Sequence, residues 1–506
     1  MASEIILLSF SIFVVIFLGV GAYAAKRSAP TDVDYLLGSR SFGTWFVGLS
    51  AGATGNSGFI MLGAVGMGYT MGLSGVIMGL AWFIGDLTFW SFFPEKFNRI
   101  GRDRDCNTIP ELLSSGLSGR GALAIRQIAG LLIVVLIGAY TAAQFSAAAK
   151  TLNVFFDLDM NIGIIVSALA ILAYCTTGGL RASLWTDVVQ AVIMLAITTG
   201  MLTVAFIAVG GFSAVVDGLN AIDPELANFT GTFTPWTLLA FVLGYACAGF
   251  GFGISQPQVI VRLLAGRSPE EARKAKWIYV LFIQYTWHCM ALFGMAARLL
   301  IPGIDDPEQA LPLYAFQNFD PWLIGVILAG IFSAIASTAD SQVLVSSSSL
   351  AIDVAPGFYK KMSARFGVRY QQVVTLVVGA SAALAAIFFS SSVFVLIIFA
   401  VSMLSSSLGP AMFNVILKRP TSTLAISACM VSGLMVAISW RMLGYGETLN
   451  ETFPGFLTGL IVHDVVVRLS SRKNLAGGSL TATESKLLPP NPSATDQTLN
   501  PGDAQP

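Results

Sequence analysis

Apolar runs of about 20 residues recur along the whole chain, and short polar stretches separate them. A run of this length can cross a hydrocarbon core of roughly 30 Å as a helix, which satisfies its own backbone hydrogen bonds. We therefore predict an all-α membrane protein with about 13 transmembrane helices, near residues 5–24, 43–66, 73–94, 121–147, 160–177, 185–210, 236–261, 275–297, 322–349, 371–390, 393–416, 423–440 and 453–467.

The composition supports a membrane location and excludes a water-soluble surface. Hydrophobic residues make up 55% of the chain and charged residues 11%, whereas a soluble domain averages about 25% charged residues. The formal net charge of zero gives no indication of nucleic-acid binding, and we expect none. We expect contact with membrane lipids, and no obligate protein partner is evident from the sequence.

The loops between the predicted spans differ in charge. Lys and Arg concentrate in every second loop, beginning with the loop after the first span, and the intervening loops are acidic. Only Lys150, Arg298 and Arg441 lie on the acidic side. Because basic loops are retained in the cytoplasm, we predict a multi-pass protein of the inner cell membrane with the N-terminus outside and the C-terminus inside.

Two predicted spans contain segments that favour an interrupted helix. Residues 48–58 contain Gly48, Gly52, Gly55 and Gly58 among small polar residues, and residues 244–257 carry four further glycines before Pro257. Small residues can also serve close helix packing. However, two such segments five spans apart are typical of inverted repeats with discontinuous helices.

This spacing predicts five parts of the chain. They are a first helix and cytoplasmic loop (1–41), a first inverted repeat of spans two to six (42–211), a second repeat of spans seven to eleven (235–418), two C-terminal helices (419–470) and a disordered cytoplasmic tail (471–506).

The ninth predicted span carries a row of oxygen-bearing side chains. Ser337, Asp340 and Ser341 share one helical face at spacing i, i+3, i+4. The carbonyl of Ala334 lies one turn before Ser337 and Thr338. A hard cation such as sodium prefers oxygen ligands, and freed carbonyls of Ala53 and Asn56 could complete its shell.

Another group must compensate the negative charge of Asp340, since placing a carboxylate at mid-bilayer costs about 2.5 to 3.5 kcal/mol. Asp187, near the start of the sixth span, is the best candidate to share a cation with it. With Ser341, the two carboxylates would suit an additional sodium site, although such a pair could carry a proton instead. Asp86, inside the third span, has no partner that the sequence identifies.

Several motifs resemble those of the sodium:solute symporter family, most closely its bacterial sodium/proline members. The likeness covers roughly residues 30–420. Its main elements are the residue runs 34–40, 50–53, 57–58, 177–182, 185–187, 256–257 with Arg262, and 337–350.

The resemblance implies a LeuT-type core of two inverted five-helix repeats. It assigns sodium as the coupling ion to Ala53, Asn56, Ala334, Ser337 and Thr338, and in relatives with a further sodium, to the positions of Asp187, Ser337, Asp340 and Ser341. It also implies a substrate site bordered by Ser57, Gly58, Tyr140, Phe250, Phe252, Ile254 and Pro257.

Two departures from the family pattern leave the substrate open. Proline-type members carry an aspartate where Gly55 stands, and an aromatic pair in their seventh span is replaced by Phe250 and Ile254. Sodium-coupled uptake of proline or a similar small amino acid by alternating access is our first expectation. A sugar, a monocarboxylate or a vitamin are alternative solutes.

Other classes fit the sequence less well. Protons could replace sodium as the coupling ion. An intramembrane aspartyl hydrolase would use Asp187 and Asp340 as a dyad, but no Gly-x-Gly-Asp motif surrounds either residue. An enzyme would also not need paired glycine breaks. A channel or a sensor is a further alternative, and no output domain is evident that would favour a sensor. We therefore expect a transporter and not an enzyme.

Overall fold

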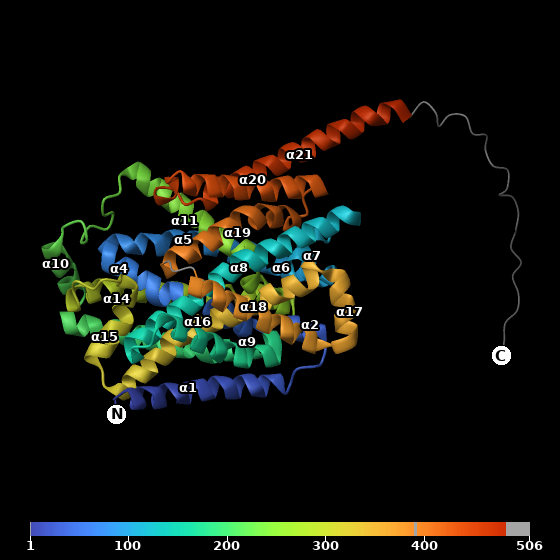
Figure 1. Cartoon of the computed structure of the whole chain (residues 1–506). Coiled ribbons are helices and arrows are strands. Elements are labelled where there is room, and N and C mark those ends of the chain that lie inside the picture. Colours follow the sequence, from blue (N-terminus) through green and yellow to red (C-terminus); the bar gives the residue numbers. More distant parts are fainter. Residues whose placement is uncertain (1, 389–391, 482–506) are drawn as a thin grey trace, which may run out of the picture.

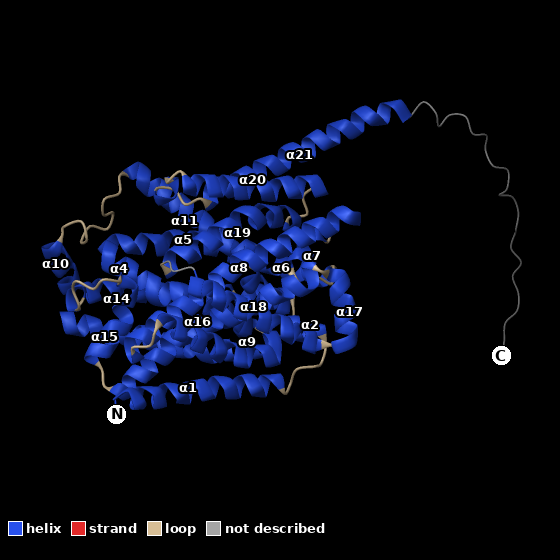
Figure 2. Ribbon diagram, viewed as in Figure 1, coloured by secondary structure: helices blue, strands red, loops and turns tan. Residues whose placement is uncertain are grey.

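The computed structural model describes residues 2–388 and 392–481, and every regular element in these residues is a helix (Figure 2). The long helices run side by side in one bundle (Figure 1). The first helix lies on one flank of this bundle and the last two lie on the opposite flank. The central helices between these flanks are therefore shielded from the surroundings on both sides.

The first half of the chain contains ten α-helices: α1 (Ala2–Ala25), α2 (Asp32–Leu37), α3 (Thr44–Gly58), α4 (Val65–Met71), α5 (Val76–Phe92), α6 (Pro94–Asp103), α7 (Ile109–Ser114), α8 (Gly119–Phe156), α9 (Met160–Val209) and α10 (Phe212–Ile222). The second half contains α11 (Pro235–Ser255), α12 (Pro257–Ala265), α13 (Pro269–Lys274), α14 (Lys276–Leu300), α15 (Ala310–Asn318), α16 (Pro321–Ser348), α17 (Pro356–Phe366), α18 (Val368–Phe388), α19 (Val393–Ile416), α20 (Thr423–Met442) and α21 (Thr452–Thr481). Two π-helical turns, Phe59–Ala64 and Ser349–Val354, extend α3 and α16.

Eleven stretches of the described residues are long and apolar enough to cross a membrane, so the predicted number of thirteen is approximate. The predicted second and third spans form one continuous run, Thr44–Phe92. The predicted fifth span, Met160–Thr176, is apolar but shorter than the other spans. Hydropathy alone cannot place the boundary inside the first run, where Gly72 interrupts the helix with a φ of 57°.

The two predicted helix interruptions are present. The first follows the small-residue segment of α3, where Ser57 has φ 52° and ψ 175°. The second lies at Gln256 (φ −79°, ψ 113°), between α11 and α12. The glycines of α11 remain helical, and the break occurs at the end of the predicted segment. Its cause is Pro257, which lacks an N–H group and forces the preceding residue out of the α region.

A third interruption divides α9 at Gly179, which has φ 55° and ψ −148°. A Cβ atom at this position would lie 2.5 Å from the carbonyl oxygen of Tyr35, so the segment around α2 sits directly on the break. Asp34 and Arg181 form an ion pair across this contact. Burial alone would raise the pKa of Asp34, but hydrogen bonds from Arg181 and Ser39 hold that pKa below its usual value.

The C-terminal helix is longer than predicted. Helix α21 continues to Thr481, beyond the boundary at residue 471 where we expected the tail to begin. Good helix formers such as Leu475 and Ala476 follow the apolar stretch, and no proline occurs before Pro489. The rest of the expected disordered tail, residues 482–506, lies outside the described residues.

Helices α4 and α14 approach so closely that their backbones touch. A Cβ atom on Gly68 would lie 1.9 Å from the carbonyl oxygen of Ala291, and one on Gly294 would lie 2.1 Å from that of Val65. Small residues permit such approaches between membrane helices. The crossing positions α14 against the segment that follows the break in α3.

We expect Gly68→Ala to destabilise the protein, because the added methyl group meets backbone that cannot rotate away. Overpacking of this kind typically costs about 1 to 3 kcal/mol. Thermal unfolding of the purified protein in detergent measures the effect. The matched control is Gly138→Ala on α8, where nothing lies within 4 Å of the new Cβ atom, and the higher helix propensity of Ala should leave stability equal or slightly raised. Equal unfolding temperatures for the two variants would contradict the close crossing.

Candidate functional site

The break in α3 lies at the centre of the candidate site. Ser57 is fully buried in a left-handed conformation that costs a non-glycine residue about 1 to 3 kcal/mol. Its hydroxyl accepts the N–H of Phe59 at 3.1 Å and a hydrogen bond from the Tyr140 hydroxyl at 3.4 Å. The side-chain oxygen of Gln144 accepts the N–H of Gly58 at 2.9 Å. Side chains of α3 and α8 therefore satisfy N–H groups that a continuous helix would pair internally.

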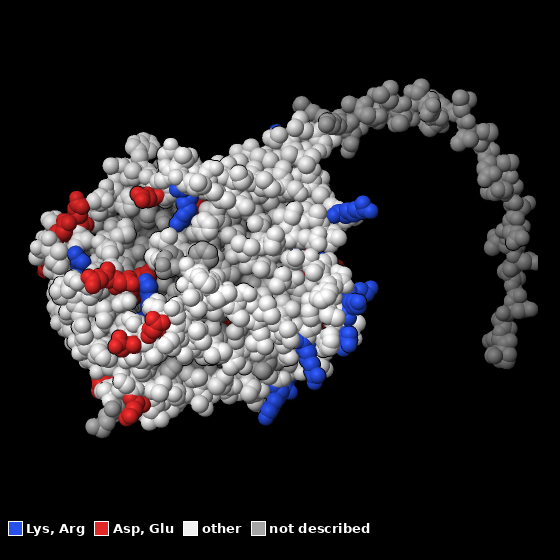
Figure 3. Space-filling view, viewed as in Figure 1, with Lys and Arg blue, Asp and Glu red and all other residues white. Residues whose placement is uncertain are grey.

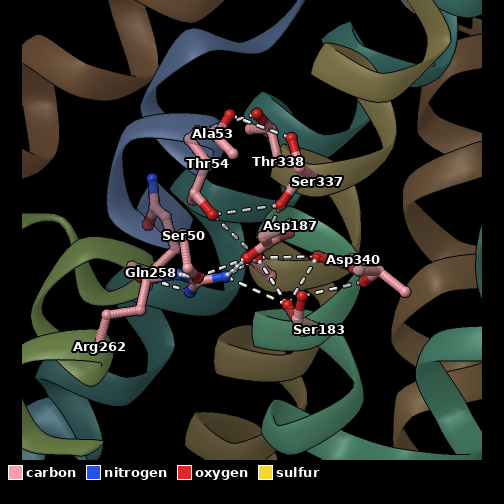
Figure 4. A network of polar contacts seen from close by, with 12 residues as sticks. Ser50, Ala53, Thr54, Ser183, Asp187, Gln258, Arg262, Ser337, Thr338 and Asp340 are labelled. Carbon is pink, nitrogen blue, oxygen red and sulfur yellow. Dashed lines mark hydrogen bonds and ion pairs between the residues drawn. The ribbon is translucent and has the colours of Figure 1, made fainter. Parts of the chain in front are cut away.

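Oxygen atoms from α3 and α16 converge beside this break (Figure 4). The Ser337 hydroxyl donates to the carbonyl oxygens of Ala53 at 3.0 Å and Ala334 at 3.2 Å. The Thr338 hydroxyl donates to the carbonyl oxygens of Thr54 at 2.8 Å and Ala334 at 3.0 Å. All five residues are fully buried. Two hydroxyl oxygens and three carbonyl oxygens thus gather at one place, and we refer to them as the oxygen cluster.

The oxygen cluster offers ligands of the kind that a hard cation prefers. Four of the five residues that the sequence analysis assigned to sodium contribute to it, and the fifth, Asn56, does not. The amide nitrogen of Asn56 lies 3.3 Å from the Met194 sulfur, and its carbonyl accepts the N–H of Phe59. The carbonyl of Thr54, which the sequence analysis did not include, joins the cluster through its hydrogen bond from Thr338.

A second buried cluster lies on the same side of α16 and contains an arginine. Arg262, on α12, donates through Nη2 to Asp187 at 2.9 Å and to the hydroxyls of Ser183 at 3.1 Å and Ser341. Its Nε donates to Ser50 at 2.8 Å, and the Ser50 hydroxyl donates to Asp187 at 2.6 Å. Arg262 and Asp187 are both fully buried. The ion pair therefore joins the second broken helix to α9.

Asp340 borders this cluster without contacting the guanidinium group through a hydrogen bond. One carboxylate oxygen accepts hydrogen bonds from Ser183 at 3.1 Å and Ser341 at 2.8 Å. The other oxygen, and one oxygen of Asp187, have no hydrogen-bond partner among the described residues. The predicted residues Asp187, Asp340 and Ser341 are therefore brought together as expected.

Arg262 stands in the position where the sequence analysis placed an additional sodium ion. We had noted this arginine only as part of a motif, since 75 residues separate it from Asp187. Its place at the end of the predicted seventh span was the available signal, because a base within a membrane segment needs a buried partner.

A small cavity of about 20 Å³ adjoins the break in α3, which is enough for roughly one water molecule. Aromatic rings form most of its wall. The ring centroids of Phe59 and Trp287 lie 5.0 Å apart, and those of Trp82 and Trp287 lie 5.6 Å apart. The cavity is lined by Gly55, Phe59, Trp82, Tyr140, Phe252, Tyr279, Ile283, Trp287, Ile397, Ile398 and Val401.

Two of the predicted substrate-site residues, Tyr140 and Phe252, line this cavity. Ser57 adjoins it through the hydrogen bond from Tyr140, and Gly58 directly precedes Phe59, which lines it. These four residues come from α3, α8 and α11, and the packing of those helices brings them to one place.

The other three predicted substrate-site residues do not line the cavity. Phe250 packs against the rings of Phe93 at 5.4 Å and Phe456 at 5.7 Å. It precedes Phe252 by two positions, so it lies on a different face of the helix. Ile254 is fully buried and Pro257 begins α12. Most of the aromatic wall cannot be recognised in the sequence, since aromatic residues within apolar spans have no distinguishing local pattern.

Comparisons with known proteins agree with this geometry. The family model described as sodium:solute symporter family matches residues 35–432. The osmoregulated proline transporter OpuE of Bacillus subtilis (strain 168) is 26% identical over 96% of this chain and 98% of its own length. A sodium/proline symporter of Haemophilus influenzae is 29% identical over 92% of this chain and 95% of its own length.

Two solved structures share the fold. A Na⁺-coupled sialic acid symporter in a substrate-bound, outward-open state aligns with a TM-score of 0.79 at 19% identity, covering 92% of this chain and 97% of its own. Mhp1, a nucleobase-cation-symport-1 family transporter, aligns with a TM-score of 0.56 at 14% identity, covering 87% and 95%. The predicted fold, a bundle with discontinuous helices of the LeuT type, is confirmed.

We expect Arg262→Gln to destabilise the protein strongly, because it leaves the Asp187 carboxylate buried without its ion-pair partner. Breaking a buried pair from one side typically costs about 3 to 5 kcal/mol. The double variant Arg262→Gln with Asp187→Asn removes both charges and should recover most of that loss. Thermal unfolding of the single and double variants measures the coupling. Additive losses would show that the ion pair does not hold α12 against α9.

Proposed function

Because the chain belongs to the sodium:solute symporter family, we propose that it carries proline or a similarly small amino acid into the cell together with sodium. It is a multi-pass membrane transporter and not an enzyme, and sodium is its coupling ion. The amino-acid substrate rests on the relatives, since three of them are described as proline transporters or sodium/proline symporters. Sugars, monocarboxylates and vitamins are the alternative solutes.

The oxygen cluster is the observation that carries this proposal. The hydroxyls of Ser337 and Thr338 reach across the helix interface to carbonyls of Ala53 and Thr54 on α3. A sodium ion at this position would join α16 to the broken helix of the first repeat. Its ligands would be oxygens that now hydrogen-bond to one another, so the site needs little rearrangement to accept the ion.

Alternating access follows if sodium binds one arrangement of the two helices more tightly than another, because a ligand shifts only an equilibrium whose states it distinguishes. Sodium between α3 and α16 would favour the arrangement that forms the cavity for the solute. The cavity must widen to admit a solute, since its present volume of about 20 Å³ is far below that of an amino acid.

A vestibule of about 470 Å³ leads toward this cavity from the end of the bundle that holds α10 and α15 (Figure 1). The ring of Phe394 lines the vestibule and stacks on Phe59 at 5.3 Å. Lys150 pairs with Asp306 at 2.8 Å and with Glu308 at 2.5 Å beside it. The stacked rings form a thin gate, and their separation would open the cavity to the vestibule.

We place the vestibule outside the cell. Figure 3 shows Lys and Arg mainly at one end of the molecule and Asp and Glu mainly at the other. The acidic end is the end of α10 and α15, and α1 begins there (Figure 1). Since basic loops stay in the cytoplasm, we propose that the N-terminus lies outside and that α21 ends on the cytoplasmic side. The proposed location is the inner cell membrane.

The driving force suffices for uptake against a gradient. Moving one positive charge inward across 100 mV supplies about 2.3 kcal/mol, and a tenfold sodium gradient adds about 1.4 kcal/mol. One sodium ion per solute could therefore support an accumulation of several hundredfold.

We expect purified protein in liposomes to take up proline or another small amino acid only with an inward sodium gradient. Parallel vesicles with a potassium gradient and with a proton gradient separate sodium coupling from the alternatives. A sugar, a monocarboxylate and a vitamin complete the solute panel. Sodium-driven uptake of one of these in place of every amino acid would refute the proposed substrate.

We expect Ser337→Ala combined with Thr338→Ala to raise the half-saturating sodium concentration by orders of magnitude, because both side-chain ligands of the oxygen cluster are lost. Sodium-dependent uptake in the same liposomes measures this. The matched control is Ser381→Ala, which removes a hydroxyl that donates only to a carbonyl of its own helix on the exposed face of α18. Unchanged sodium dependence in the double variant would remove the basis of the site assignment.

A further inference from the structure

Asp86 is a fully buried carboxylate that the oxygen cluster does not use. It lies on α5, inside the membrane-length run Thr44–Phe92. One oxygen lies 3.5 Å from the Tyr279 hydroxyl, and the other has no hydrogen-bond partner among the described residues. A carboxylate in this environment costs about 2.5 to 3.5 kcal/mol and is retained chiefly where it serves a function.

Asp86 lies directly behind the wall of the central cavity. Trp82, one helical turn earlier on the same face of α5, lines the cavity, and so does Tyr279. The neighbouring Gly85 packs its Cα against the backbone of α11, where a Cβ atom would lie 2.1 Å from the carbonyl oxygen of Ala246. This contact fixes the rotation of α5, so that Asp86 faces Tyr279 and the cavity behind it.

The cavity wall around this carboxylate suits a positive charge. Phe59, Trp82 and Trp287 present aromatic rings within 6.4 Å of one another, and such rings attract organic cations through their faces. Trp90 stacks on Tyr279 at 4.2 Å and holds the phenol in place. An aromatic wall with a carboxylate behind it favours an ammonium group over a neutral or anionic one.

Gly55 on α3 lies close to the Tyr279 hydroxyl. It lines the cavity, and a Cβ atom on it would lie 3.5 Å from that hydroxyl and 3.0 Å from the Ile283 side chain. Asp86 and Gly55 therefore both lie next to one residue of the cavity wall. Gly55 contributes no side chain that would fill the cavity beside this hydroxyl.

We propose that Asp86 recognises the positively charged nitrogen of the transported solute and restricts transport to solutes that carry an ammonium group. This inference rests on the proposed function and adds a specificity residue to it. The solute nitrogen enters from the cavity, the Tyr279 hydroxyl guides it, and the unpartnered carboxylate oxygen receives it. The aromatic rings enclose the organic body.

The test uses three pairs of probes that differ mainly in the ammonium group. They are proline with tetrahydrofuran-2-carboxylate, alanine with lactate, and trimethylglycine with 3,3-dimethylbutanoate. Binding to the purified full-length protein in saturating sodium is followed by tryptophan fluorescence, because Trp82 and Trp287 line the cavity. Wild-type protein should bind at least one ammonium probe about tenfold or more tightly than its partner, as expected for a charge-assisted contact.

We expect Asp86→Asn to lower the affinity ratio within a probe pair by about tenfold to a hundredfold. The sodium titration measured without solute should stay unchanged. Asp86→Glu keeps the charge and should keep the preference. Adding Gly55→Asp to Asp86→Asn places a carboxylate next to the Tyr279 hydroxyl from α3 and should restore part of the preference. The unchanged sodium titration also verifies that each variant is folded.

Three results would overturn the inference. The first is wild-type protein that shows no preference for any ammonium probe, and the second is Asp86→Asn with the wild-type preference. The third is an Asp86 variant whose sodium titration changes while its preference persists, which would make Asp86 an ion ligand. In the last two cases, wild-type protein would still show sodium-driven uptake of an amino acid. The inference about Asp86 would then fail, and the proposed function would stand.

Discussion

The interruption of α3 at Ser57 is the constraint on which the candidate site depends. A helix inside an apolar bundle cannot leave its backbone groups unpaired, since each unsatisfied group costs several kcal/mol there. Gln144 and the Ser57 hydroxyl satisfy the freed N–H groups, and Ser337 and Thr338 hydrogen-bond to the carbonyls before the break. The hydrogen bonds that make the break tolerable are also those that gather oxygen atoms for an ion.

The second broken helix meets a different requirement, which is the pairing of buried charge. Arg262 follows the break at Gln256, and its guanidinium group contacts Asp187 and three serine hydroxyls. A planar fork with several donors can satisfy more acceptors than an ammonium group could. Two carboxylates, Asp187 and Asp340, thus border a single guanidinium group, and each keeps one oxygen without a hydrogen bond among the described residues. The arginine links α12, α9 and α16 at the end of the oxygen cluster.

The cavity connects these two elements to the solute. It is bordered by α3 at Gly55 and by rings from α5, α11 and α14, and it lies next to the hydroxyl of Tyr140 that bonds to Ser57. Widening the cavity would move residues that contact the break directly. The ion and the solute would therefore act on the same short stretch of α3, which is a physical basis for coupling them.

The chain pattern determined the helical class, the approximate number of spans and both interruptions, because apolar length, glycine content and Pro257 act locally along the sequence. It also identified Ser337, Thr338, Asp340 and Asp187, since hydroxyls and carboxylates within apolar spans are conspicuous. Only the tertiary structure decided that the Thr54 carbonyl joins the oxygen cluster, that Arg262 contacts Asp187 and Ser341, and that Phe59, Trp82, Tyr279 and Trp287 line the cavity. These outcomes depend on the rotation and contact of helices far apart in the sequence, which backbone contacts such as that of Gly68 with Ala291 fix and which no local pattern encodes.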